Sequence, residues 1–159
     1  MSADYAGACA AIRARFEDNW SSGGIALTPI AFLNEAPPSR QDASGNAAPW
    51  VFFEIVHNGS YLIGSGTPGQ QTIVYDGLIK AHVFVPINTG VDDGLAKAVA
   101  IGELFRNKVF FDAVTPGCYV RSGFDKNGQP RVDEGDAASD DGQWFRVTAT
   151  IPFEYWHRG

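Results

Sequence analysis

The feature that most constrains the fold of this chain is the longest strand signal, from Thr72 to Ile87, in which small and branched apolar residues recur at every second position from Ile79 on. Successive side chains of a β-strand point to opposite faces of a sheet, so the alternation predicts a long strand with one buried face. A second run, from Trp144 to Tyr155, alternates in the same way. The buried faces are expected to carry Ile79, Ala81, Val83, Val85 and Ile87 in the first run and Phe145, Val147, Ala149, Ile151, Phe153 and Tyr155 in the second.

Two segments have the apolar spacing of amphipathic helices. The first runs from about Asp4 to Trp20 and is rich in alanine, the residue with the highest helix propensity. The second runs from Val91 to about Val109, and Thr89 is placed to cap its first turn. The residues expected to face the core are Cys9, Ile12, Phe16 and Trp20 in the first helix and Leu95, Ala98, Val99, Gly102, Phe105 and Val109 in the second.

Shorter strands and loops complete the expected order of elements. The strands are Ile25–Leu33, an edge strand because it contains Pro29, Trp50–Val56 and Cys118–Ser122. The loops are Asn34–Pro49 and Phe124–Gly142, and the Gly-rich His57–Gln71 is expected to be a protruding hairpin arm because of its apolar patch Tyr61–Ile63. This order predicts one domain over residues 1–159, of the α+β class: a mainly antiparallel sheet of about four to five strands, with two helices packed on one face and long loops.

Charge narrows the partners that the chain can bind. Twelve Lys and Arg against 18 Asp and Glu give a net charge of −6, and only four of the cations are lysine. Nucleic-acid binding draws most of its affinity from basic residues that neutralise phosphates, so DNA or RNA is not expected as the main ligand. No apolar run approaches the ~18–20 residues that span a bilayer, so no membrane association is expected.

The apparent catalytic and metal-binding motifs lack the neighbouring residues or elements that their chemistry requires. The Gly64–Gly69 stretch matches G-x-G-x-x-G, but a strand signal follows it where phosphate binding requires a helix. His57, His82 and His157 have no His or Cys neighbours at metal-ligand spacing. We therefore expect no enzyme activity, no catalytic residue, no metal site and no cofactor.

Apolar side chains on the predicted sheet exceed what two helices can cover. Excess apolar surface of this kind usually marks an interface. The residues predicted to form it are Trp50, Phe52, Phe84 and Trp144 on the sheet and Tyr61 and Leu62 in the Gly-rich arm. The same aromatic residues leave open a different function, a small-molecule or peptide-binding module that uses the sheet as a pocket.

Landmarks along the chain follow a specific order. An amphipathic helix ending near Trp20 precedes LTPIAF (27–32), and a proline-rich loop leads to APWV (48–51). YDGLI (75–79) and HVFVPINTG (82–90) follow, and the second helix closes in ELFR (103–106). In this order the chain resembles the tail-terminator-like minor tail proteins of long-tailed bacteriophages and prophages. The similarity spans roughly residues 4 to 155, with HVFVPINTG and ELFR as its most specific part.

This resemblance implies a structural role in the virion. Such proteins form a homo-hexameric ring on the head-proximal end of the tail tube, where they end tube polymerisation and join the tail to the head-completion complex. The implied partners are further copies of the chain, the tail tube protein and a head-completion or neck protein, with assembly in the host cytoplasm. DNA passes through the ring without specific binding, and the family supplies no cofactor or catalytic residue. Another neck or minor tail component is the alternative within this class.

The acidic run in the last loop has two interpretations. Its members are Asp133, Glu134, Asp136, Asp140 and Asp141. Carboxylates repel phosphates, so this loop, or the Gly-rich arm, is hypothesised to line or border the channel that DNA traverses. The alternative is an outer loop that charge keeps solvated.

Overall fold

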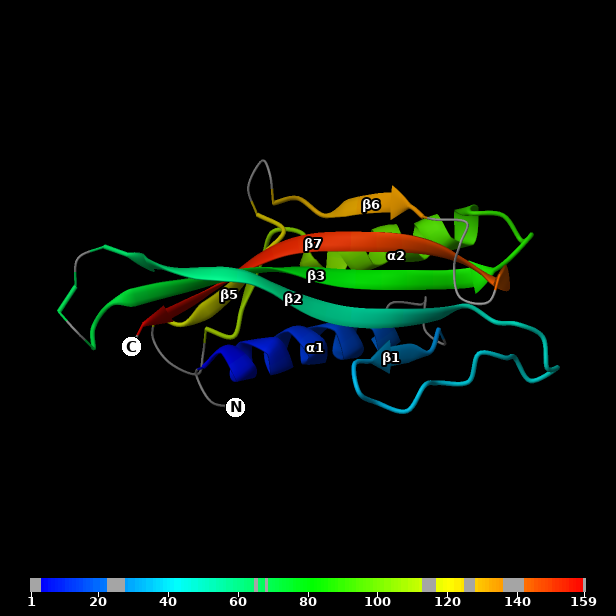
Figure 1. Cartoon of the computed structure of the whole chain (residues 1–159), viewed down its shortest axis with the longest axis horizontal. Coiled ribbons are helices and arrows are strands. Elements are labelled where there is room, and N and C mark those ends of the chain that lie inside the picture. Colours follow the sequence, from blue (N-terminus) through cyan, green and yellow to red (C-terminus); the bar gives the residue numbers. More distant parts are fainter. Residues whose placement is uncertain are drawn as a thin grey trace.

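Three long antiparallel strands form the centre of one curled sheet (Figure 1). They are β2 (Trp50–Ile63), β3 (Thr72–Pro86) and β7 (Trp144–Arg158). The structure is a computed structural model that describes residues 4–22, 28–64, 66–67, 69–112, 117–124, 128–135 and 142–158. β3 lies in the middle and pairs with β2 on one side and with β7 on the other. The two alternating runs of the sequence thus form adjacent strands, and β2 continues into the segment expected to be an arm.

Four short strands extend the sheet on both sides. They are β1 (Ile30–Phe32), β4 (Lys108–Phe110), β5 (Tyr119–Ser122) and β6 (Arg131–Glu134). Within the described residues the order is β1-β2-β3-β7-β5-β4, and β6 also pairs with β7. β1 runs parallel to β2, and the other described pairs are antiparallel.

The predicted fold class is therefore wrong. The described chain is mostly β, with seven strands in a mixed, strongly curled half-barrel sheet and two helices, rather than an α+β fold with a mainly antiparallel sheet of four to five strands. Two strands, β4 and β6, were missed, because segments of three or four residues are too short to show an alternating pattern. β6 lies in the acidic segment assigned to a loop, and β4 lies in the segment assigned to the second helix.

The helices are α1 (Tyr5–Ser22) and α2 (Asp92–Phe105). Asp4 caps α1, since its Oδ1 accepts a hydrogen bond of 2.7 Å from the Gly7 N–H. The predicted cap of α2 is wrong: Val91 precedes the helix without a side-chain bond, and the Thr89 hydroxyl donates to the Pro86 carbonyl instead. α2 also ends four residues early. Asn107 has a φ of 51°, a left-handed conformation that breaks the helix, and Val109 is consequently exposed rather than buried.

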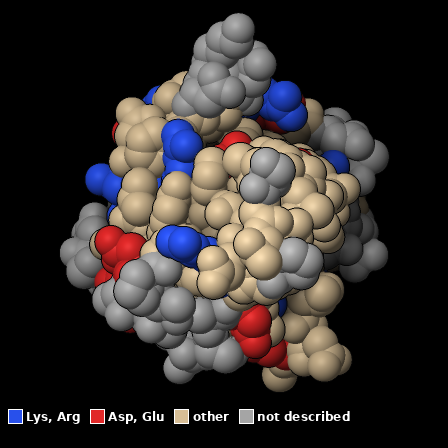
Figure 2. Space-filling model, turned by 90° about the vertical axis from the view of Figure 1, so that its left-hand side faces the viewer, with Lys and Arg blue, Asp and Glu red and all other residues tan. Residues whose placement is uncertain are grey.

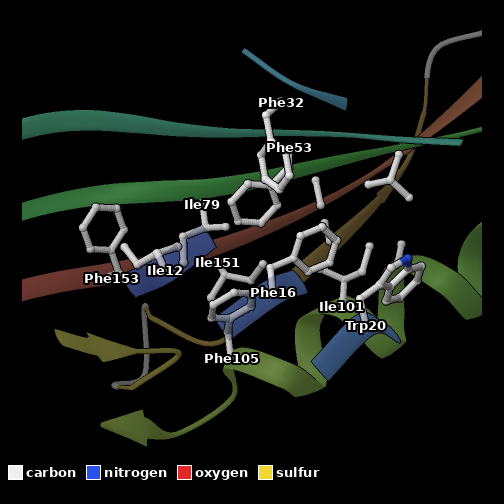
Figure 3. Close-up of a cluster of buried hydrophobic side chains, with 14 of the residues drawn as sticks. Ile12, Phe16, Trp20, Phe32, Phe53, Ile79, Ile101, Phe105, Ile151 and Phe153 are labelled. Carbon is white, nitrogen blue, oxygen red and sulfur yellow. The ribbon is translucent and has the colours of Figure 1, made fainter. Parts of the chain in front are cut away.

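Both helices pack on the same face of the sheet and enclose the main core (Figure 3). The Phe16 ring stacks on Phe53 of β2 with centroids 4.5 Å apart, and Phe105 lies 6.3 Å from Phe53. Phe16 and Phe105 have no exposed surface, and each such burial contributes about 1.5–3 kcal/mol to stability. Gly102 of α2 allows a close approach, although to Pro130 before β6 rather than to the sheet: a Cβ there would lie 3.1 Å from the Pro130 Cβ. None of the described helices is long and apolar enough to cross a membrane.

Candidate interaction surfaces

The face of the sheet opposite the helices, here called the outer face, carries the predicted interface residues of the sheet. Because side chains alternate along a strand, Trp50 and Phe52 point away from the core that Val51 and Phe53 enter. The strand register places these residues in rows across β2, β3 and β7. One row is Trp50, Phe84 and Arg146, and the next is Phe52, His82 and Thr148.

Three of the predicted interface residues form a small second core at the end of the outer face. The Trp50 and Phe84 rings stack at 4.2 Å and 8°, and Trp144 meets Trp50 edge-on at 6.4 Å and 90°. Trp50 is 4% exposed, Trp144 5% and Phe84 9%. The structure therefore brings these three residues together and buries them within the chain. Phe52 lies beside them and is half-buried.

A cleft of about 460 Å³ opens beside this aromatic cluster. We call it the Trp50 cleft; its main lining residues are Leu33, Pro37 and Arg40 from the segment after β1, and Trp50, Phe84 and Arg146 from the sheet. The Arg40 guanidinium lies 4.4 Å from the centre of the Trp50 ring, a cation–π contact. The aromatic residues of the sheet left a pocket open as an alternative, but the part of Arg40 was not predicted, because Arg40 lies in a loop without periodicity and reaches Trp50 only in the folded chain.

Two residues that line the Trp50 cleft each have a buried side-chain nitrogen without a hydrogen-bond acceptor among the described residues. They are Nε1 of Trp50 and Nε of Arg146. A buried donor without a partner costs on the order of 1–3 kcal/mol, so such groups in a folded chain require an explanation. In the part of the chain that the structure describes, Arg146 also forms no ion pair.

His82 links two strands on the outer face. Its Nε2 lies 3.1 Å from Oε1 of Glu54 on β2, and its Nδ1 lies 2.9 Å from the Thr148 hydroxyl on β7. Phe52 stacks on the imidazole at 6.1 Å and 16°. Glu54 and Thr148 occupy both ring nitrogens, so this arrangement stabilises the sheet and leaves no nitrogen directed at a ligand.

The Ile63 end of β2 has exposed side chains, whereas the Trp50 end is buried. Tyr61 is 47% exposed, Leu62 57% and Ile63 39%, and Figure 2 shows this end as a largely uncharged surface with isolated charged groups. β1 pairs with β2 only at Val51–Phe53. Among the described residues, no strand pairs with the outer edge of β2 from Glu54 to Ile63, which we call the open β2 edge. The predicted interface residues Tyr61 and Leu62 are thus separated from Trp50 by the length of the strand.

Only part of the acidic run lies within the described residues. Asp133 and Glu134 are exposed on β6, opposite Thr148 and Val147 of β7, and Asp133 accepts a bond of 3.2 Å from Arg131. Asp136, Asp140 and Asp141 lie outside the described residues. The hypothesis that these acids border a channel therefore stays a prediction.

Metal-ligating side chains in the described residues do not assemble into a metal centre. No group of three His, Cys, Asp or Glu side chains within the described residues could hold a metal ion. Burial raises the pKa of the half-buried Cys9 thiol, which disfavours its reactive thiolate form. The Cys118 sulfur lies 3.8 Å from Nδ1 of His157, but Cys118 is buried and 1% exposed.

Comparison with known proteins identifies a similar fold but indicates no function. No family model matches this chain, and no curated protein matches it. A solved structure whose printed name describes no function is similar, with a TM-score of 0.57 and 18% sequence identity. The match covers 93% of this chain and 95% of that chain, so the likeness extends over almost the whole fold. At this identity it concerns the fold alone.

Proposed function

We propose that this chain is a structural subunit of a phage tail. In this proposal six copies form a ring that caps the head-proximal end of the tail tube, ends its polymerisation and joins it to the head-completion complex. The ordered landmarks from LTPIAF to ELFR support the proposal, because they resemble tail-terminator-like proteins over most of the chain. Its partners are further copies of itself, the tail tube protein and a neck protein, and its location is the virion.

The observation that carries the proposal is the open β2 edge. Unpaired strand edges offer backbone N–H and C=O groups to other chains, and monomeric proteins usually protect them with charges, proline or a covering segment. This edge ends instead in Tyr61, Leu62 and Ile63, three apolar side chains that are each more than a third exposed. A bulge between His57 and Gly59 also protects the edge locally, and the three exposed side chains lie beyond it. Such an edge suits a subunit that is covered in an assembly.

Mass by light scattering, with negative-stain images of the purified chain, tests this proposal. We expect rings of six copies at micromolar concentration or on addition of tail tubes. Leu62→Lys should abolish them by placing a charge at the open β2 edge. Val99→Lys is the matched control, since Val99 is 50% exposed on α2, away from this edge. A chain that stays monomeric both alone and with tubes would contradict the proposal.

The acids of β6 have a place in the same proposal. Asp133 and Glu134 would border the DNA channel, where negative charge prevents phosphates from adhering. A density map of the assembled neck tests this placement. Acids on the outer circumference, further from the DNA path than a Debye length of about 8–10 Å, would show that they only keep the loop solvated.

A further inference from the structure

The outer edge of β4 is unpaired and exposed, as the open β2 edge is. β4 is the last strand in the order β1-β2-β3-β7-β5-β4, and within the described residues no strand pairs with its other side. Lys108 and Val109 are exposed there, Val109 to 51%. Unpaired edges of this kind present backbone N–H and C=O groups to another strand.

These two edges are the opposite ends of one row across the sheet. The strand register connects, in order, Gly59 of β2, Asp76 of β3, Glu154 of β7, Arg121 of β5 and Val109 of β4. All four steps are antiparallel, so β2 and β4 run in the same direction. A second copy that continues this sheet therefore sets its β4 beside the open β2 edge as a parallel pair.

A ring requires contacts between two different surfaces of each copy. A two-fold contact joins the same patch on both copies and closes at a dimer, whereas a head-to-tail contact closes as a ring. The open β2 edge of a ring subunit must therefore meet a surface other than itself. β6 is at the wrong level, because Asp133 is in register with Thr148, His82 and Phe52, where β1 already covers β2. β1 flanks β2 on the same side of the sheet, so β4 is the matching edge.

The charges and apolar side chains at the two edges are complementary. Glu54 and Asp76 lie at or beside the open β2 edge, and a Cβ on Gly59 would lie only 3.7 Å from Oδ1 of Asp76. The β4 edge is basic instead, with Lys108 on the strand and Arg106 just before it. Among the described residues, neither Asp76 nor Lys108 forms an ion pair. Charges of opposite sign select the correct surface in an encounter.

We propose that β4 of a second copy covers the open β2 edge, so that one sheet continues from copy to copy around the ring. The two strands pair in parallel. Val109 packs beside Tyr61, because the row that ends at Val109 and Gly59 places both side chains on the outer face. The inference rests on the proposed ring and names the surface through which the ring closes.

Cysteine cross-linking of the full chain identifies the surface that covers the edge. Tyr61→Cys and Val109→Cys are produced together in one cell and treated with a short bis-maleimide. We expect covalent dimers of the two variants, formed at least about tenfold faster than when Val99→Cys replaces Val109→Cys, since side chains in contact react at high effective concentration. Val99 is equally exposed but lies on α2. The unaltered chain, with Cys9 half-buried and Cys118 buried, gives the background.

Charge reversal provides a second measurement that needs no cysteine. Lys108→Glu should weaken assembly about threefold or more, because it opposes the acids of the β2 edge with a further acid. Arg131→Glu is the matched control, since Arg131 is exposed on β6 and changes the net charge by the same amount. Equal weakening by both reversals would contradict the inference. This comparison decides the matter if the cysteine variants do not assemble.

The outcomes separate the inference from the proposed ring. Rings of six copies in light scattering without the link between Tyr61→Cys and Val109→Cys would overturn the inference and leave the ring standing. Cross-linking of Tyr61→Cys to itself would show that β2 edges pair about a two-fold axis, which also overturns it. An unaltered chain that stays monomeric both alone and with tail tubes would overturn the ring and this contact together.

Discussion

The two faces of the sheet bury aromatic residues in different ways. On the covered face, Phe53 packs between Phe16 of α1 and Phe105 of α2, so two helices exclude water. On the outer face, Trp50 and Phe84 stack on each other, and a loop arginine covers the pair. Both arrangements leave these side chains less than a tenth exposed. Apolar residues on a second face therefore do not identify an interface, because a loop can bury them within one chain.

Phe105→Ala should have the largest effect, because it opens a cavity where three elements meet on the covered face. We expect a loss of about 3–5 kcal/mol in the free energy of unfolding. Val99→Ala on the same helix is the control and should change stability by about 0.5 kcal/mol or less, since Val99 is half exposed. Denaturant unfolding measures both. An unchanged midpoint for Phe105→Ala would mean that Phe105 does not lie in the core.

Phe84→Ala tests the outer face in the same assay. The ring packs against one aromatic layer rather than between sheet and helices, so we expect a smaller loss, about 1.5–3 kcal/mol. Fluorescence should also change, because the variant exposes the Trp50 ring that Phe84 covers. A loss as large as that of Phe105→Ala would show that the two faces are equally well packed, which would break the distinction drawn above.

Gly77→Ala tests how tightly side chains and backbone of neighbouring strands pack around β3. A Cβ at this position would lie 2.4 Å from the Val56 carbonyl oxygen and 2.7 Å from Cε1 of Phe153. We expect destabilisation of about 1–3 kcal/mol from overpacking. Gly59→Ala is the matched glycine on β2, where the nearest atom would lie 3.7 Å away, and it should be nearly neutral. Thermal unfolding of the two variants measures the difference. Equal midpoints would contradict the prediction that Gly77→Ala is the less stable variant.

Salt should have the smallest effect, and it concerns the open β2 edge. Each copy has a net charge of −6, so copies that assemble must overcome mutual repulsion. Repulsion between exposed charges is screened beyond about 8 Å in physiological salt, so assembly should strengthen as salt rises. Light scattering across a salt series measures this change. Assembly that weakens steadily with salt would indicate that specific ion pairs dominate the contact.

Periodicity was sufficient to predict the long elements. The core positions Ile79–Val85 of β3 and Val147–Tyr155 of β7 could be assigned, because each strand is long enough to repeat its pattern several times. The core residues Phe16 and Phe105 could be assigned to helix faces for the same reason. Phe145 and Ile87 show the limit of this reasoning: both occur in the alternating runs, yet Phe145 is only half-buried and Ile87 is exposed beyond the end of β3.

The amino-acid pattern alone thus established two helices, β3, β7, the first half of β2 and an apolar surplus, because burial imposes a local period on each of them. Tertiary structure decided the remainder. β4 and β6 exist because a neighbouring strand supplies their hydrogen bonds, and three or four residues contain no such information themselves. The Trp50 cleft likewise joins Arg40, Trp50 and Arg146, which lie far apart in the chain. Their proximity depends on strand pairing and loop placement, which no local pattern encodes.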